Sequence, residues 1–201
     1  MSTDFPPKNA LMVAQRLVDE MPKGQLRSEL LRSLTPHART SDQIRAFHKM
    51  FDIPIAKGSV ESMSPEDMYR RLHMLIEEVL ELVFHCGFDL YVQPDENENN
   101  GHRAVLEHIP ESKQNRVEML DALGDVNVLI HGFAIELGDN LDDATTEIHA
   151  SNLTKMGEDG LPIVNGVNVL EDSQYPVGKI LKGPNYVKPN LKQMLAFWSQ
   201  R

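Results

Sequence analysis

Apolar residues recur every three or four positions in three long stretches of the chain, residues 64–86, 112–137 and 140–156. This spacing is typical of helices that bury one face. The first stretch opens on a Ser-Pro pair, and a glycine follows each of the first two stretches, so ordinary start and stop signals are present. The later half of the second stretch is apolar nearly all round, which indicates burial between helices or at a subunit interface. We predict three long helices with these bounds.

Shorter elements are predicted on either side of the long helices. Residues 9–21 and 25–34 show two short amphipathic patterns, and Ser41 is placed to cap a third short helix. A polar, asparagine-rich run at residues 95–101 predicts a solvated loop. Beyond residue 157, glycines and prolines favour a hairpin or an extended flap.

The organisation that follows is an all-α fold. Residues 1–60 are predicted to form an N-terminal helical extension, for which we expect a role in packing or subunit contact. Residues 61–201 are predicted to form the main domain, a helical bundle with an irregular C-terminal flap.

Composition and charge narrow the class of protein. The 201 residues are 41% hydrophobic and 25% charged, as in an ordinary globular protein. A formal net charge of −10, with no basic stripe, disfavours a nucleic-acid partner. Neither a signal segment nor a run of about 18 uncharged apolar residues is present, so we expect a cytoplasmic protein that has no membrane partner. Cys86, the single cysteine, cannot form an internal disulfide.

Three carboxylates crowd one side of the first long helix. Glu77, Glu78 and Glu81 lie three or four positions apart, which makes them helical neighbours. A pattern of this kind is most often a solvated acidic face. Here the flanking residues are nearly all apolar and no lysine or arginine stands four positions further on. These features favour a functional role.

The second long helix carries a matching stripe, Glu118, Asp121 and Asp125. If the two helices pack antiparallel, the stripes face each other and bring five or six carboxylates together. Burying such charges without partners is costly, and oxygen-rich sites suit Mg²⁺ or Mn²⁺. The two stripes therefore predict a site for divalent cations.

The sequence lacks the motifs of several other classes of enzyme and metal-binding protein. The sequence has no phosphate-binding P-loop, no HExxH motif, no adjacent His-Asp pair and no glutamate followed three positions later by histidine. His85, His131 and His149 lie on predicted helices, and we expect them to be packing residues.

Four segments carry a family resemblance. In chain order they are EEVLE, NRVEMLDALGDVNVLIHG, EIHASNLTKMGEDGLPI and GKILKGPNY. Over roughly residues 64–187 they resemble the all-α nucleoside triphosphate pyrophosphohydrolases, the MazG-like and phosphoribosyl-ATP pyrophosphohydrolase-like superfamily. The resemblance implies a MazG-like bundle that forms a homodimer or higher homo-oligomer. It also implies Mg²⁺-dependent hydrolysis of a (deoxy)nucleoside triphosphate to the monophosphate and pyrophosphate, with Mn²⁺ as a substitute metal.

The family pattern, ExxE followed by a spacer and ExxD, fits this sequence in two registers. In the first, Glu78 and Glu81 supply ExxE, and Glu118 and Asp121 supply ExxD after a spacer of 36 residues, longer than is usual in the family. In the second, a Leu-Gly-Asp sequence makes Asp125 the ligand, with Asp121 beside it. Asp121 serves in both registers, and we favour the second.

The resemblance implies roles for these side chains. Glu78, Glu81, Asp121 and Asp125 become metal ligands, and Glu118 replaces Asp125 in the first register. Glu77 shares a metal or takes the proton of the attacking water.

Substrate contacts are also implied. Asn152 and Lys155, at the end of the third long helix, are expected to reach the triphosphate. Lys179 and Lys182 could close over the phosphates from the flap, with Tyr186 against the base, although an ordinary basic loop explains these three residues equally well. No residue identifies the base or the sugar. An alternative function is a non-catalytic binding or scaffold bundle whose acids hold a structural divalent cation.

Overall fold

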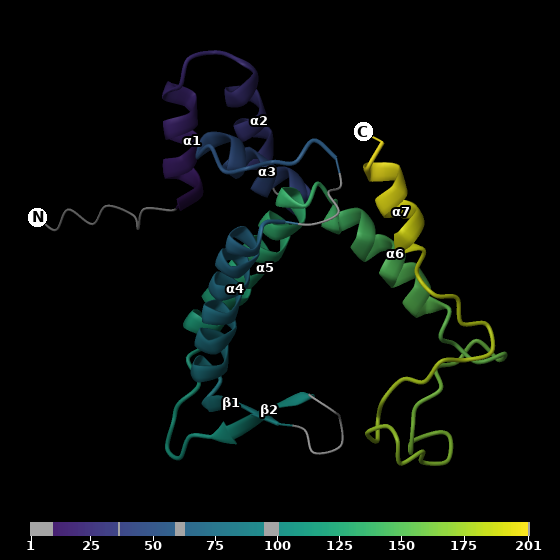
Figure 1. The fold of residues 1–201 in the computed structure, drawn as a ribbon. Coiled ribbons are helices and arrows are strands. Elements are labelled where there is room, and N and C mark those ends of the chain that lie inside the picture. The colour runs from purple at the N-terminus through teal and green to yellow at the C-terminus, as the bar shows by residue number, and fades with distance from the viewer. Residues whose placement is uncertain (1–9, 36, 59–62, 95–100, 201) are drawn as a thin grey trace, which may run out of the picture. The chain divides into compact units, whose positions relative to one another are not determined.

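The computed structural model describes residues 10–35, 37–58, 63–94 and 101–200 (Figure 1). Within these ranges the chain forms seven helices and one two-stranded sheet. The elements are α1 (Ala10–Glu20), α2 (Gln25–Ser33), α3 (Thr40–Met50), α4 (Pro65–His85), β1 (Phe88–Pro94), β2 (His102–His108), α5 (Arg116–Glu136), α6 (Leu141–Leu153) and α7 (Leu191–Trp198). The mostly helical character and the three long helices are confirmed.

The chain divides into two compact units. Unit 1 comprises Met1–Ala56 and Val60–Leu137, and unit 2 comprises Lys57–Ser59 and Gly138–Arg201. The first nine residues of the predicted extension lie outside the described residues, and so does the predicted loop at 95–101, apart from its last residue.

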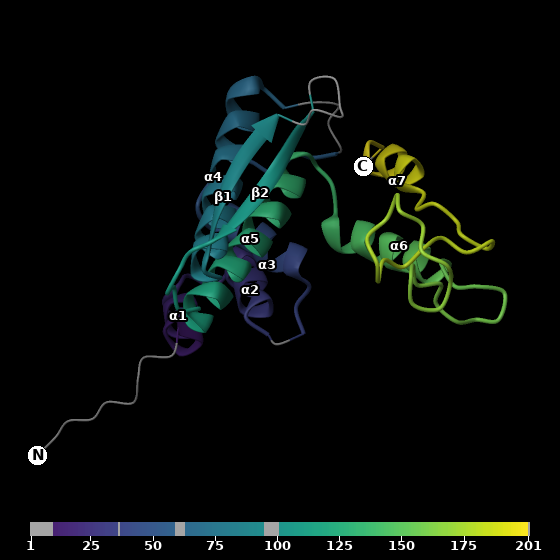
Figure 2. The same ribbon diagram turned by 90° about the horizontal axis from the view of Figure 1, so that it is seen from below.

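The two longest helices, α4 and α5, lie side by side in unit 1 (Figures 1 and 2). They run antiparallel. At one end the Asn115 N–H donates to the His85 carbonyl at 3.2 Å, and at the other end Arg71 pairs with Glu136. The offset between the helices is therefore fixed at both ends.

Local signals explain where these helices begin and end. The Ser64 side chain accepts a hydrogen bond from the Asp67 N–H at 3.1 Å and caps α4, as predicted. Gly87 and Gly138 follow α4 and α5 with φ of +89° and +79°, a left-handed conformation that glycine adopts without strain. Both stops were predicted from the sequence.

A β-hairpin between α4 and α5 is an element that the all-α prediction did not include. Strands β1 and β2 pair antiparallel, with Leu90 opposite Leu106 and Phe88 opposite His108. The rings of the second pair lie 5.4 Å apart. Each strand has seven residues and little buried surface, so its alternation of apolar and polar residues is too short and too weak to stand out in the sequence.

Three short helices form the N-terminal part of unit 1. Their small core contains Val18, Leu30 and Ala46. The prediction that Ser41 caps α3 is wrong, because α3 begins at Thr40. Ser41 is buried instead, and its Oγ lies 3.1 Å from Nδ1 of His131 on α5. This contact helps to join the N-terminal helices to the long pair.

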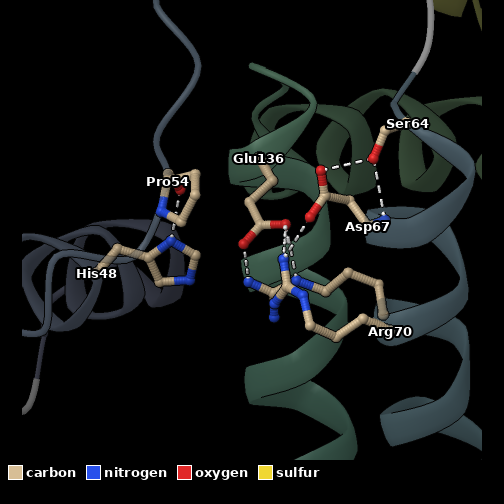
Figure 3. A network of polar contacts seen from close by, with 7 residues as sticks. His48, Pro54, Ser64, Asp67, Arg70 and Glu136 are labelled. Atoms are coloured by element: carbon tan, nitrogen blue, oxygen red, sulfur yellow. Dashed lines mark hydrogen bonds and ion pairs between the residues drawn. The ribbon is translucent and has the colours of Figure 1, made fainter.

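A polar network lies where α3, α4 and α5 meet (Figure 3). Glu136, on α5, accepts two hydrogen bonds from Arg71, one of them from Nε at 2.9 Å, and both side chains are almost fully buried. Arg70 also reaches Glu136, at 3.4 Å. His48 on α3 is buried, and its Nδ1 lies 3.0 Å from the Pro54 carbonyl. Burial lowers the pKa of His48, although the bond to Pro54 opposes this shift.

In unit 2, a long irregular segment connects α6 to α7 along the chain. Asn140 caps α6 by accepting from the Asp143 N–H at 3.2 Å. Residues 157–189 contain turns and isolated β-bridges, in keeping with the predicted flap. The eight-residue helix α7 follows directly after a proline-rich stretch and was not predicted from the sequence. No helix among the described residues is long and apolar enough to cross a membrane.

Candidate metal centre

The acidic residues of α4 differ in their exposure. Glu78 is half-buried, whereas Glu77 and Glu81 are exposed. Glu77 Oε2 lies 3.4 Å from Nδ1 of His73, one turn earlier on the same helix. Glu78 is therefore the acidic residue of this helix that lies closest to its packed side.

Glu78 faces the acidic stripe of α5. Burial raises the pKa of Glu78 above its ordinary value, and the negative charges of Asp125, Glu81, Glu77 and Asp121, in that order, raise it further. The structure thus brings four other predicted carboxylates within electrostatic reach of Glu78. Such an arrangement repels itself unless a cation neutralises it.

The sixth carboxylate, Glu118, belongs to the other end of the stripe. Ligand atoms of Glu81, His85 and Glu118 all lie within 4.8 Å of one another. His85 Nε2 is 3.6 Å from Glu81 Oε1. Glu81 therefore stands between two groups, with Glu78 and the two aspartates on one side and His85 and Glu118 on the other.

His85 was expected to be a packing residue, and the structure places it among these acids. A sequence signal was present, because Glu81 and His85 are four positions apart and share one side of the helix. Their meeting with Glu118 depends on the offset between α4 and α5, which the sequence pattern does not give.

The donor set fits a hard divalent cation. Among the described residues, Glu81, His85 and Glu118 form the group whose ligand atoms lie within 4.8 Å of one another, and this group does not include Glu78, Asp121 or Asp125. The acids that act on Glu78 through their charge offer oxygen ligands alone, which suits Mg²⁺ or Mn²⁺. Burial of these acids, expected from the sequence, holds only in part, since Glu78 and Glu118 are half-buried and the other four are exposed. Open positions suit Mg²⁺, which usually keeps several of its waters.

The predicted substrate-binding residues all lie in unit 2. The Gly183 N–H donates to the Lys155 carbonyl at 3.1 Å, which ties the segment carrying Lys182 and Tyr186 to the end of α6. The Lys182 ammonium lies 4.7 Å from the centre of the Tyr186 ring. A β-carbon at Gly183 would lie 2.2 Å from the Met156 carbonyl oxygen, so this contact requires glycine.

Lys179 and Asn152 have different surroundings. The Lys179 ammonium lies 4.2 Å from the centre of the Tyr175 ring. The backbone carbonyl of Lys179 accepts a hydrogen bond from the N–H of Asn165, the most deeply buried polar residue described in unit 2. Asn152 is exposed near the end of α6. Lys179 and Lys182 thus lie three residues apart on one segment, and each ammonium packs on a different tyrosine ring, Tyr175 and Tyr186.

Comparison of the chain with protein-family models gave no match, and comparison with curated protein sequences gave no significant match.

Proposed function

We propose that the chain is a Mg²⁺-dependent nucleoside triphosphate pyrophosphohydrolase with a MazG-like helical bundle. The observation that carries this proposal is the position of Glu78, half-buried on α4 and facing Asp121 and Asp125 on α5. A gathering of carboxylates that repel one another is explained when cations share the site. The resemblance of the sequence motifs supplies the reaction.

We propose a separate role for each of the acidic residues of α4 and α5. Glu78, Glu81, Asp121 and Asp125 hold the metal through carboxylate oxygens. Mg²⁺ held by these carboxylates would neutralise phosphate oxygens and lower the pKa of a coordinated water. Glu77 is exposed beside Glu78 and either shares a metal or accepts the proton of the attacking water. Mn²⁺ is expected to replace Mg²⁺, because both prefer oxygen ligands.

Unit 2 is proposed to supply the substrate contacts. The segment that carries Lys182 and Tyr186 is tied to Lys155 through the Gly183 N–H and the Lys155 carbonyl, and we propose that the two lysines meet phosphates and that the Tyr186 ring meets the base. Lys179 and Asn152 are proposed as further substrate contacts. The proposed substrate is a free nucleotide and not nucleic acid, in keeping with the net charge of −10.

An exposed apolar stripe on α4 supports the proposed homodimer or higher homo-oligomer. Large side chains recur there at helical spacing and stay exposed in the single chain: Tyr69, Leu72, Ile76, Leu80 and Phe84. Val117 and Leu120 of α5 are exposed as well. A contiguous patch of this kind marks an interaction surface, and a second copy of the same helix pair would cover it.

A panel of nucleoside triphosphates, assayed for release of pyrophosphate with Mg²⁺, tests the proposal. We expect a monophosphate and pyrophosphate as products. A diphosphate with orthophosphate would contradict it. Metal binding without turnover of any nucleotide would support the alternative, a scaffold bundle with a structural cation.

A further inference from the structure

A groove lies between α2 and α3 in the N-terminal part of unit 1. Its volume is about 490 Å³, within the range of small-molecule pockets, about 300–1,000 Å³. Residues of α2 form one wall, residues of α3 form the other, and Thr35 and residues 37–39 between the two helices also line it. The Gln43 side chain joins the walls by donating to the Ser33 carbonyl at 3.0 Å.

The groove is basic in an acidic chain. Four cationic side chains and two carboxylates line it: Arg32, Arg39, Arg45, Lys49, Glu29 and Asp42. The chain as a whole has 20 basic and 30 acidic residues. The local excess of positive charge is thus opposite in sign to the charge of the molecule, which makes the groove a selective place for an anion.

One of the two carboxylates is already neutralised. Lys49 donates a hydrogen bond to Glu29, and this bond, followed by one from Gln25, lowers the pKa of Glu29 below its ordinary value. Within the part of the chain that the structure describes, neither Arg32 nor Arg45 has an ion-pair partner. Arg32 uses Nε on the Ser28 carbonyl at 3.3 Å, which leaves its terminal nitrogens for a ligand.

We propose that this groove binds the phosphate groups of a small anion, either inorganic pyrophosphate or the phosphate chain of a nucleotide. Guanidinium groups present paired N–H donors that match phosphate oxygens, and Arg32 and Arg45 stand on opposite walls. Among the described residues that line the groove, the one ring is the imidazole of His37, and the apolar lining is Ala38 and Ala46. The guanidinium and ammonium groups dominate the lining, so the phosphates are the part of the ligand that the groove recognises.

This inference is independent of the proposed hydrolysis, because none of the carboxylates of the candidate metal centre lines the groove. Isothermal titration of the full chain in EDTA removes metal-dependent binding at the acidic stripes, and substitution of the groove arginines separates binding in the groove from binding by the lysines of unit 2. The titrants are inorganic phosphate, pyrophosphate and a nucleoside triphosphate.

We expect pyrophosphate to bind, and Arg45→Ala and Arg32→Ala each to weaken binding at least tenfold. Asp42→Asn removes the carboxylate that Lys49 does not neutralise and should tighten binding a few-fold. This variant gains affinity, so its result does not depend on a damaged fold. Arg16→Ala on α1 is the matched control, because Arg16 is an exposed arginine outside the groove.

Binding of both the triphosphate and pyrophosphate shows that the groove accepts the phosphate chain of a nucleotide, and binding of pyrophosphate without the triphosphate identifies the inorganic anion as the ligand. The proposal is overturned if none of the three anions binds. It is also overturned if Arg45→Ala binds like the unchanged protein, or if Arg16→Ala weakens binding as much as Arg45→Ala does.

Discussion

Glu78 of α4 lies opposite Asp125 of α5, and after burial the charge of Asp125 is the strongest influence that raises the pKa of Glu78. The two residues are 47 positions apart in the sequence and meet because the helices run antiparallel. This relationship links the stability of the metal-free protein to the function that we propose.

Glu78→Gln should stabilise the metal-free protein at neutral pH. Because the folded state holds the Glu78 proton more tightly than the unfolded state does, stability falls as the pH rises above about 4.3, the ordinary glutamate value. Removing the charge should recover that loss, which we expect to be below about 1 kcal/mol for a half-exposed group. Melting curves in EDTA measure the effect.

The same variant should lose most of the thermal stabilisation that Mg²⁺ gives to the unchanged protein, since a ligand that binds the folded state raises its stability. Glu66→Gln, in the first turn of α4, is the control and should respond to Mg²⁺ as the unchanged protein does. Equal responses of the two variants would remove Glu78 from the ligand set.

Stability should also fall in mild acid because of His48. The pKa of this buried imidazole is lowered, so its contribution is present above about pH 6.5, the ordinary histidine value, and is lost as the pH falls toward the folded value. Urea unfolding between pH 7.5 and 5 should show a smaller loss for His48→Gln than for the unchanged protein. His73→Gln, at an exposed histidine of α4, should keep the full loss.

Arg71→Ala should destabilise the protein severely, by about 3–5 kcal/mol, because it leaves the buried Glu136 carboxylate without its main partner. Arg70→Ala should cost less than about 1 kcal/mol, since that side chain is 43% exposed. Chemical denaturation measures both values. Similar losses of stability in the two variants would mean that the buried pair of Arg71 and Glu136 contributes no more to stability than the exposed contact of Arg70.

Ile76→Glu should dissociate the proposed homo-oligomer. The side chain is 55% exposed in the single chain, so the substitution should leave the monomer folded and place a charge in the proposed interface. Met12→Glu, at a 71% exposed position of α1, is the control. Sedimentation equilibrium of the three proteins decides the matter, and an unchanged mass for Ile76→Glu would place the interface elsewhere.

Local chemistry made much of the helical fold predictable. The cap at Ser64 and the stops at Gly87 and Gly138 depend on a few adjacent residues, and they lie where the sequence predicts them. The β-hairpin was missed because its strands are short and mostly exposed, so their pattern resembles that of a loop.

Contacts between residues far apart in the sequence explain the other differences between the predictions and the structure. Ser41 looked like a cap, but it is a buried partner of His131, 90 positions away. The sequence placed Glu118, Asp121 and Asp125 on one stripe and left two registers open. The structure separates the ends of that stripe, with Glu118 beside His85 and Asp125 beside Glu78, because the pairing of α4 with α5 fixes which residues meet.

Pyrophosphate release at saturating Mg²⁺, compared between Asp125→Asn and Glu118→Gln, tests the central claim most directly. We expect Asp125→Asn to lose about three orders of magnitude in rate or more, because it removes a ligand opposite Glu78, whereas Glu118→Gln should lose far less. Both variants should keep the helical content of the unchanged protein, and EDTA should abolish its activity. Full activity in EDTA, or an inactive Glu118→Gln beside a nearly active Asp125→Asn, would contradict the site described for this protein.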